Sequence, residues 1–160
     1  MTEQEKRMHR CCFTGHRPEK LTEPADVVIA GLEREIRNAI IDGLNVFITG
    51  MARGVDIWAA EIVLRLRSEG EDVKLICASP YEGFERGWRA DWQHRYNAIL
   101  RNADLVRYIC SGYSRACFQI RNEWMVNHSS LVIAAFNGEP GGTKNTIDYA
   151  AKASVTVRLV

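Results

Sequence analysis

The stretch from Thr49 to Asp56 has the residue types of a phosphate-binding turn. It reads Thr-Gly-Met-Ala-Arg-Gly-Val-Asp, with an apolar run before it and a helical pattern of apolar residues after it. Its glycines let the backbone approach a bound group, and the first turn of the next helix offers unpaired N–H groups and a positive dipole end. The spacing of Gly50 and Gly54 matches neither the P-loop pattern nor the Gly-x-Gly-x-x-Gly fingerprint. We therefore expect a phosphate-bearing ligand, with Asp56 either as a first-turn acid or as a ligand contact.

Two other loops carry polar residues directly after an apolar run. His16 and Arg17 follow the run 11–14 and are expected at the mouth of a pocket. His16 is there either a proton donor or a residue that stabilises the turn. The second glycine-rich turn, residues 137–143, is followed by Lys144, which either neutralises phosphate or is a solvated lysine.

Length and composition indicate a single domain, residues 1–160. An apolar share of 46%, a charged share of 26% and a net charge of +1 are ordinary for a globular protein and give no general reason to expect nucleic acid as a partner. No apolar stretch suits a membrane span or a signal peptide, so we expect a cytoplasmic protein with no membrane partner. The five cysteines lack a Cys-x-x-Cys spacing and are expected to be reduced and mostly buried. Because no metal-ligand spacing occurs, we expect no metal, and we expect no cofactor.

Apolar periodicity predicts strands and helices in alternation. The expected strands are residues 11–14, 46–49, 73–78, 104–110, 131–136 and 155–159. The expected helices are residues 26–42, 55–68, an amphipathic part of 81–101, 114–128 with Ser114 as a cap, and 143–153. This order favours an α/β fold with a parallel sheet and helices on both faces. Ligands bind such sheets at the C-terminal strand ends where the strand order reverses, and the loops 15–18, 49–56, 111–114 and 137–146 are expected to converge there.

Four motifs, taken together, resemble a known family. They are Gly15-His16-Arg17-Pro18, the stretch Gly50 to Asp56, Arg121-Asn122 with Met125-Val126, and Gly141-Gly142-Thr143-Lys144-Asn145-Thr146. This combination resembles the YpsA-like branch of the SLOG superfamily, which joins the DNA-processing protein DprA to the Lonely-guy nucleotide hydrolases. The resemblance covers residues from about 11 to 157. It implies a Rossmann-like three-layer sandwich with a mostly parallel, doubly wound sheet, and a pocket for a nucleotide or a nucleotide-derived ligand.

The resemblance also implies which residues hold the ligand. Gly50, Gly54 and Asp56 match the family's phosphate-binding strand-loop-helix, and Gly141, Gly142 and Thr143 match its second phosphate loop. With the neighbouring loop residues, the expected ligand contacts are Gly15, His16, Arg17, Thr49, Gly50, Arg53, Gly54, Asp56, Tyr113, Arg121, Asn122, Gly141, Gly142, Thr143, Asn145 and Thr146.

Catalysis is a second implication of the resemblance. Arg121 matches an arginine that takes part in cleaving the N-glycosidic bond of nucleoside 5′-monophosphates in the Lonely-guy enzymes. Their second loop ends in Gly-Thr-x-x-Glu, whereas this chain has no glutamate at that spacing and Asp148 could replace it only with an extra loop residue. Such a reaction needs a carboxylate near the sugar, and Asp56, Glu123 and Asp148 are the candidates. Arg121 and Asp148 are therefore the expected catalytic residues if any reaction occurs.

Three functions follow in order of preference. The first is binding of a nucleotide or a nucleotide-derived ligand such as an ADP-ribose-like compound, with a sensor as one use. The alternative is a Lonely-guy-like nucleoside 5′-monophosphate N-glycosidase. The third is DprA-like binding of single-stranded DNA, for which Trp88 and Trp92 with nearby arginines form only a partial aromatic and basic stripe, so that nucleic acid is an unlikely partner. Trp88 and Tyr113 could stack on a base, although an aromatic stripe usually packs on a core. A homodimer is expected from related folds.

Overall fold

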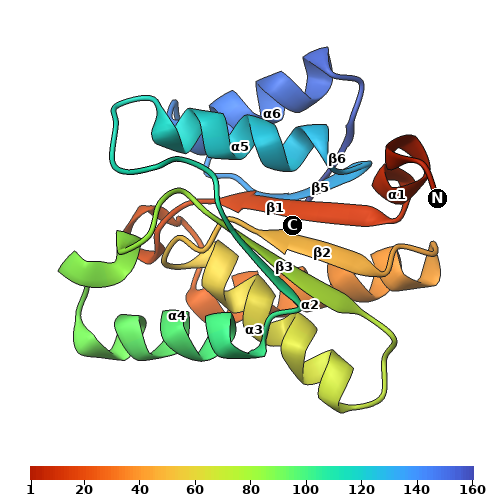
Figure 1. Ribbon diagram of the computed structural model, residues 1–160, viewed down its shortest axis with the longest axis horizontal. Helices are drawn as coiled ribbons and strands as arrows, with labels where there is room; N and C mark the ends of the chain where they lie inside the picture. Colours follow the sequence, from red (N-terminus) through yellow and green to blue (C-terminus); the bar gives the residue numbers. More distant parts are fainter.

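Six strands form one sheet in the order β4-β3-β2-β1-β5-β6 in the computed structural model, which describes residues 1–160 (Figure 1). The strands are β1 (Arg10–Gly15), β2 (Val46–Thr49), β3 (Lys74–Ser79), β4 (Leu105–Tyr108), β5 (Leu131–Ala135) and β6 (Thr156–Leu159). All five strand pairings are parallel. The predicted α/β fold with a parallel sheet is confirmed.

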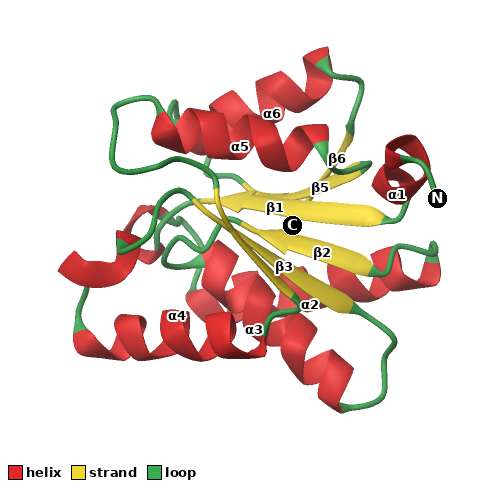
Figure 2. Cartoon of the chain, in the orientation of Figure 1, coloured by secondary structure: helices red, strands yellow, loops and turns green.

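Helices cover both faces of this sheet, as predicted. They are α1 (Glu3–Met8), α2 (Ala25–Ile41), α3 (Val55–Ser68), α4 (Ala90–Asn102), α5 (Cys117–Asn127) and α6 (Gly142–Lys152), with short 3-10 helices η1 (Pro18–Lys20) and η2 (Phe84–Gly87). Figures 1 and 2 show α2, α3 and α4 below the sheet and α5 and α6 above it. None of the helices combines the length and the apolar character that a membrane crossing requires.

The strand order reverses beside the central strand β1. The chain runs outward from β1 through β2 and β3 to β4, and then returns to place β5 on the other side of β1. The connection after β1 leads to α2 on one face, and the connection after β5 leads to α6 on the other. The two connections diverge at the C-terminal ends of β1 and β5, so a crevice opens between them.

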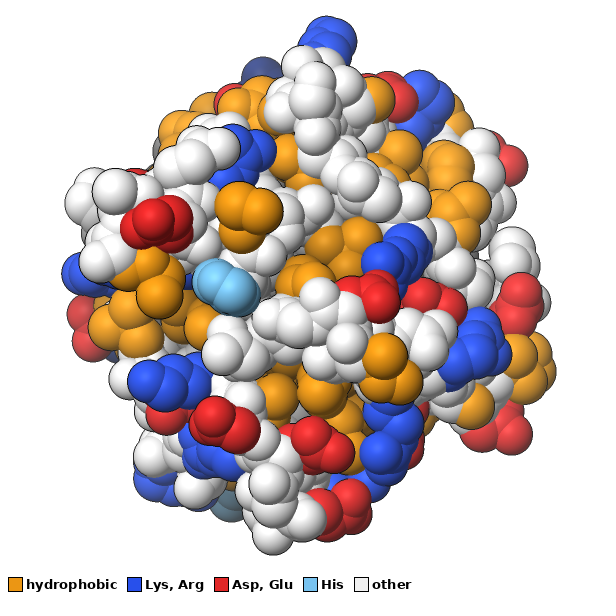
Figure 3. All heavy atoms as spheres, turned by 90° about the vertical axis from the view of Figure 1, so that its right-hand side faces the viewer, with side chains coloured by type: hydrophobic (Ala, Val, Ile, Leu, Met, Phe, Trp, Pro, Cys, Tyr) orange, Lys and Arg blue, Asp and Glu red, His pale blue; other side chains and the backbone are white.

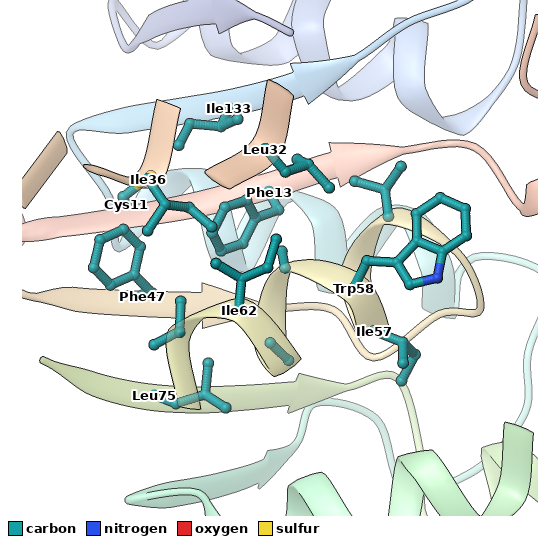
Figure 4. Close-up of a cluster of buried hydrophobic side chains, with 14 of the residues drawn as sticks. Cys11, Phe13, Leu32, Ile36, Phe47, Ile57, Trp58, Ile62, Leu75 and Ile133 are labelled. Atoms are coloured by element: carbon teal, nitrogen blue, oxygen red, sulfur yellow. The ribbon is translucent and has the colours of Figure 1, made fainter. Parts of the chain in front are cut away.

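The larger apolar core lies between the sheet and the helices α2 and α3. Figure 4 shows part of it, and its residues include Cys11, Phe13, Leu32, Ile36, Phe47, Ile57, Trp58, Ile62, Leu75 and Ile133. The rings of Phe13 and Phe47, on adjacent strands, stack with centroids 6.1 Å apart. A smaller cluster on the other face packs β1, β2 and β5 against α5 and α6. Alternate residues of each strand thus enter opposite cores, which explains the continuous apolar runs.

Helix α1 and the starts of α4 and α5 differ from what the apolar periodicity predicts. The short helix α1 has no apolar stripe. A capping box stabilises its start: the Thr2 side chain accepts from the Glu5 N–H, and the Glu5 side chain accepts from the Thr2 N–H. Helix α5 begins at Cys117, and Ser114 does not cap it. In the segment 81–101 the regular helix starts at Ala90, and its aromatic residues pack on the core: Tyr96 is buried. All five cysteines are free thiols and four are buried.

Candidate functional site

A cavity of about 410 Å³ opens where the strand order reverses. Its walls come from the loops that follow β1, β2 and β5 and from one face of α5. The lining residues are Phe13, Thr14, Gly15, His16, Arg17, Lys20, Ala52, Asp56, Phe118, Arg121, Asn122, Met125, Asn137, Glu139, Pro140, Gly141, Gly142 and Thr143. Open parallel sheets bind their ligands at this place, and the volume suits a small organic ligand.

The loop between β2 and α3 is held in one conformation by its own side chains. The hydroxyl of Thr49 donates to the carbonyl oxygen of Asp56 at 2.8 Å and accepts from the N–H of Met51 at 3.3 Å. Met51 is buried and has a φ of 66°, a left-handed conformation that is uncommon for a residue other than glycine. Gly54 has a φ of 91°, and a Cβ there would lie 2.8 Å from the carbonyl oxygen of His16. The glycine is therefore required by both its backbone angle and its packing.

Gly50 is enclosed by the two charged side chains at the base of the cavity. A Cβ on Gly50 would lie 2.8 Å from Asp56 Oδ2 and 3.0 Å from Arg121 Cζ. Its carbonyl oxygen accepts a hydrogen bond from Arg121 Nη1, and Arg121 Nε donates to Asn122 Oδ1 at 2.9 Å. These bonds fix the guanidinium of α5 against the loop that begins α3. The absence of a side chain at Gly50 lets helices from opposite faces of the sheet meet at one site.

Arg121 is a buried cation with only 5% of its surface exposed. Burial lowers the pKa of its guanidinium, and the nearby Asp56 carboxylate opposes that effect. Guanidinium groups stay protonated in proteins, so the site carries a fixed positive charge. The two bonds to Gly50 and Asn122 leave further Nη hydrogens for an anionic ligand.

Asp56 is a buried carboxyl of the cavity with only one of its two oxygens hydrogen-bonded. It is 5% exposed; its Oδ2 accepts from the N–H of Ala52 at 3.2 Å, whereas its Oδ1 is buried without a hydrogen-bond partner. Burial raises the pKa of this carboxyl to about 6, although Arg121 and the Ala52 N–H act in the opposite direction. A buried acceptor without a partner is costly, so this oxygen is a place where a ligand donor would be favoured.

The N-terminus of α6 forms the opposite wall. Gly141 precedes the helix with a φ of 147°, and no side chain caps it. The first intrahelical bond comes from the N–H of Asn145 to the carbonyl oxygen of Gly141, at 2.9 Å. The N–H groups of Gly142, Thr143 and Lys144 therefore lack partners within the helix. They lie at the positive end of the helix dipole, the local environment that favours an anion.

A clasp joins the loops after β1 and β5. The N–H of Asn137 donates to His16 Nε2 at 3.0 Å, and its side-chain amide donates to the carbonyl oxygen of Lys20 at 2.9 Å. The His16 ring also stacks on Phe136, with centroids 5.9 Å apart. Burial lowers the pKa of His16. In this structure His16 makes a hydrogen bond of the kind that the stabilising role requires.

The structure brings nine of the expected ligand contacts together as cavity lining: Gly15, His16, Arg17, Asp56, Arg121, Asn122, Gly141, Gly142 and Thr143. Three others support the walls from behind. Thr49 and Gly54 shape the loop after β2, and Gly50 anchors the Arg121 guanidinium.

The remaining expected contacts do not line this cavity. Arg53 pairs with Glu19, with 2.9 Å between Nη2 and Oε1. Tyr113, in the loop after the edge strand β4, is 71% exposed; it does not line the cavity, although its ring meets that of the lining residue Phe118 with centroids 6.3 Å apart. Asn145 is exposed on α6, and the buried Thr146 donates to the carbonyl oxygen of Gly142 at 2.8 Å.

Asp148, the expected catalytic carboxylate, also lies outside the lining. It forms an exposed ion pair with Lys144 one turn earlier on α6, with 2.8 Å between Oδ2 and Nζ. Of the three carboxylates considered from the sequence, only Asp56 lines the cavity.

Sequence reasoning missed part of the wall. Phe118 and Met125 lie three residues before and four residues after Arg121, so helical spacing places all three on one face of α5. This helical spacing is visible in the sequence and could have placed Phe118 and Met125 beside Arg121. The other additions are Phe13 and Thr14 of β1, Lys20 of η1, and Ala52, Asn137, Glu139 and Pro140, whose loops were expected at the site although these residues were not singled out.

A wider hollow lies at the opposite end of the sheet. Its volume is about 820 Å³, and it is lined by Met1, Lys6, His9, Arg10, Asn45, Val46, Asp72, Lys74, Ile76, Asp104 and Leu105, several of which begin strands. Figure 3 shows the molecule from this end, where acidic and basic side chains are interspersed among apolar ones. None of the four motifs contributes to this hollow. No three His, Cys, Asp or Glu side chains gather anywhere in the chain as metal ligands.

Fold and cavity together define a Rossmann-like α/β protein with its site at the topological switch point. A family model described as the YspA SLOG family (YpsA) matches residues 11–157. The chain belongs to this family.

Two relatives from Bacillus are similar to this chain over two thirds to three quarters of its length. The chain is 36% identical over 118 residues to the SPbeta prophage-derived protein YoqJ of Bacillus subtilis (strain 168), which covers 66% of this chain and 69% of YoqJ. It is 32% identical over 123 residues to a UPF0398 protein of Bacillus thuringiensis (strain Al Hakam), covering 76% of this chain and 67% of that protein.

Solved structures of DNA processing protein A share the fold. The protein from Helicobacter pylori, whose structure describes a single-stranded DNA binding mode, superposes with a TM-score of 0.70 at 19% identity over 98% of this chain. DprA from Streptococcus pneumoniae superposes with a TM-score of 0.67 at 20% identity over 95% of this chain. This chain spans 66% and 50% of those two chains.

Proposed function

We propose that the switch-point cavity binds a nucleotide or a nucleotide-derived ligand. The observation that carries the proposal is the pairing of an uncapped helix N-terminus with a buried arginine across one cavity. The free N–H groups of Gly142 to Lys144 and the remaining Nη hydrogens of Arg121 are donors of the kind that hold a phosphate. The family assignment supports the same ligand class.

The rest of the lining accounts for the other parts of a nucleotide. The unpartnered Oδ1 of Asp56 is an acceptor for a hydroxyl donor such as a ribose hydroxyl. Phe118 and Met125 provide an apolar wall beside it, suited to a base. His16 and Arg17 stand at the rim, where Arg17 can add charge.

A thermal-shift screen tests this proposal with AMP, cyclic nucleotides, ADP-ribose, NAD and free bases. A ligand at about a hundred times its dissociation constant adds about 2.7 kcal/mol, which is roughly 5–11 °C for a domain of this size. We expect a shift that is lost in Gly142→Leu, whose side chain would project from the first turn of α6. Gly112→Leu is the matched control, because no atom lies within 4 Å of a Cβ at Gly112. Equal shifts in both variants would refute binding at this cavity.

A second candidate function is hydrolysis of a nucleoside 5′-monophosphate at its N-glycosidic bond. The specific observation is a carboxyl with a pKa of about 6 in the cavity beside Arg121. A group with that pKa exchanges a proton readily near neutral pH, as a general acid or base must. Asp56 rather than Asp148 is then the catalytic carboxylate. This hypothesis is tested by measuring free base in each mixture after the thermal-shift screen. If every nucleotide remains intact, hydrolysis is rejected.

Single-stranded DNA binding is the third reading, favoured by the likeness of fold to DNA processing protein A. Arg89 and Arg95, two arginines of the partial stripe, form ion pairs with Asp91 and Glu61. Such pairing leaves less charge for a phosphate backbone. A mobility shift that weakens steeply as salt is raised would support strand binding, since phosphate contacts release counterions.

A homodimer is the assembly proposed for this chain. Ile120, on the outer side of α5, and Val27 on α2 are exposed apolar side chains on helices. Light scattering of the purified protein distinguishes a dimer from a monomer of 18.1 kDa.

A further inference from the structure

A second, smaller hollow lies beyond the loop that follows β2. Its volume is about 240 Å³, and its lining is Arg53, Gly87, Trp88, Arg89 and Trp92. Gly87 ends η2, and Trp88 and Arg89 lead directly into α4. We call this hollow the tryptophan cleft. It contains two of the four tryptophans of the chain and two arginines, a composition that apolar packing alone does not require.

The tryptophan cleft adjoins the switch-point cavity. Ala52 lines the cavity and Arg53 lines the cleft, and the Cα atoms of consecutive residues are only about 3.8 Å apart. Glu19 of η1 pairs with Arg53 of the cleft at 2.9 Å and with Arg17 of the cavity at 3.9 Å. Consecutive residues of one loop and one shared ion-pair partner therefore connect the two hollows.

The two indole rings of the cleft are held in place by their neighbours. The ring of Trp88 meets those of Phe84 and Tyr96 edge-on, with centroids 5.0 and 5.5 Å apart. Trp92 packs against Trp58 at 6.4 Å and carries the guanidinium of Arg95 over its ring at 4.5 Å. Rings fixed in this way lose little freedom when another planar group stacks on them.

We propose that the tryptophan cleft receives the second base of a dinucleotide-sized ligand whose first nucleotide occupies the cavity. The inference rests on the proposed function and adds the class of ligand: two bases joined through phosphate. Base stacking on aromatic side chains is favourable and tolerates any base, because every base has a flat face. The same chemistry serves a pyrophosphate link and a phosphodiester link.

The ridge between the two hollows suits the linking phosphates. Four cations line the two hollows here, Arg17 and Lys20 in the cavity and Arg53 and Arg89 in the cleft. The carboxylates near them are three: Glu19, which pairs with Arg53 and Arg17, Asp91, which pairs with Arg89, and Glu139 of the cavity lining. Cations are therefore in excess. The Arg53–Glu19 pair is exposed enough to contribute little stability, and a phosphate can replace Glu19 as the partner of Arg53.

A small ligand fits these observations better than a nucleic-acid strand. Arg95, which stacks on Trp92 but does not line the cleft, is held by both oxygens of Glu61, at 2.6 and 3.0 Å. The next arginine along α4 is thus already neutralised, and the two hollows together accommodate two bases rather than a continuous track.

Titration followed by intrinsic tryptophan fluorescence tests the proposal. The probes are AMP, ADP-ribose, NAD and a phosphodiester-linked ApA, and the comparison of NAD with ADP-ribose isolates the second base. We expect NAD, ApA or both to bind roughly tenfold or more tightly than AMP and ADP-ribose and to quench the fluorescence. Tighter binding of NAD would indicate a ligand with a pyrophosphate link between its bases, and tighter binding of ApA one with a phosphodiester link.

Substitutions in the cleft test whether the added affinity for dinucleotides comes from the cleft residues. Trp88→Leu and Arg89→Gln should each reduce the ratio of dinucleotide to AMP affinity toward one, whereas Gly142→Leu should weaken all probes together. Trp124→Leu, on α5, is the control and should retain the ratio. Circular dichroism identifies a Trp88→Leu protein that fails to fold, and Arg89→Gln, whose side chain is exposed, then decides.

Four results would overturn the inference. Equal affinities for AMP and both dinucleotides, with AMP binding still sensitive to Gly142→Leu, would mean that the cleft binds no base. The proposed function of the cavity would then remain. An advantage that survives in both cleft variants would place the second base elsewhere. Tighter, salt-sensitive binding of an octamer of thymidylate would favour a strand instead. Absence of binding by every probe would reject the proposed function itself.

Discussion

Replacement of Asp56 by asparagine should stabilise the unliganded protein at neutral pH. The carboxyl has a pKa of about 6 in the folded state against a usual value of 3.8, and a difference of about two units corresponds to about 3 kcal/mol. Because the folded pKa is raised, the folded state binds the proton more tightly, and stability falls as pH rises from about 4 to about 6. Above pH 6 the full penalty is present.

Asparagine keeps the shape of the side chain and can still accept the hydrogen bond from the Ala52 N–H, but it never ionises. Urea unfolding of the wild type and Asp56→Asn should therefore differ by up to about 3 kcal/mol at pH 7.5 and by about 1 kcal/mol at pH 4.5. Ligand binding should weaken in the same variant, since an NH2 donor then replaces the unpartnered acceptor Oδ1. A difference in stability that does not change with pH, or a wild type that is the more stable at pH 7.5, would refute the reasoning.

Three further predictions concern the surroundings of the site. Gly50→Ala should cost roughly 1–3 kcal/mol in urea unfolding, because the new methyl would lie 2.8 Å from Asp56 Oδ2; an unchanged midpoint would mean that the loop can move away. Tyr96→Phe should cost about 1 kcal/mol, since it removes the 2.8 Å bond to the Ser79 hydroxyl, and thermal melting would show whether that bond matters. Asp148→Asn breaks only an exposed ion pair and should change stability by less than about 0.5 kcal/mol. Loss of any base-releasing activity in that variant would return the catalytic role to Asp148.

The sheet could be predicted from the sequence because its strands are buried on both faces. Runs such as Leu131 to Ala135 contain only apolar residues, and every one of these five is buried. Helix α1 could not be predicted from periodicity, since none of its residues is buried and its start depends on the Thr2 cap. The order of the strands could not be predicted either, because the pattern of apolar residues does not show that β1 pairs with the distant strand β5.

The candidate site was predictable where it consists of loops and less so where it consists of a helix face. The glycine turns after β1, β2 and β5 are local signals, and they do converge on the cavity. The loop that contains Tyr113 has similar composition, yet it follows an edge strand and stays outside. Strand order, which local composition does not contain, separates the two cases: β4 is an edge strand, and Tyr113 reaches only the outer side of Phe118, a residue of the cavity wall. The partnering of Arg121 with Gly50 is also non-local, since it joins residues 71 positions apart.

The clasp between His16 and Asn137 has a consequence for how the protein is made. The two residues are 121 positions apart, and the strand that ends beside His16 pairs with β5 on one side. A ribosome adds roughly 5–20 residues each second, so β1 waits several seconds with one edge unpaired. Pairings of this range are slow to form and leave an apolar edge open to other chains in the meantime. The cavity is complete only after β5 and α6 have docked, so its ligand recognises finished molecules. Supplying that ligand during expression should raise the yield of folded protein by drawing late intermediates to the native state.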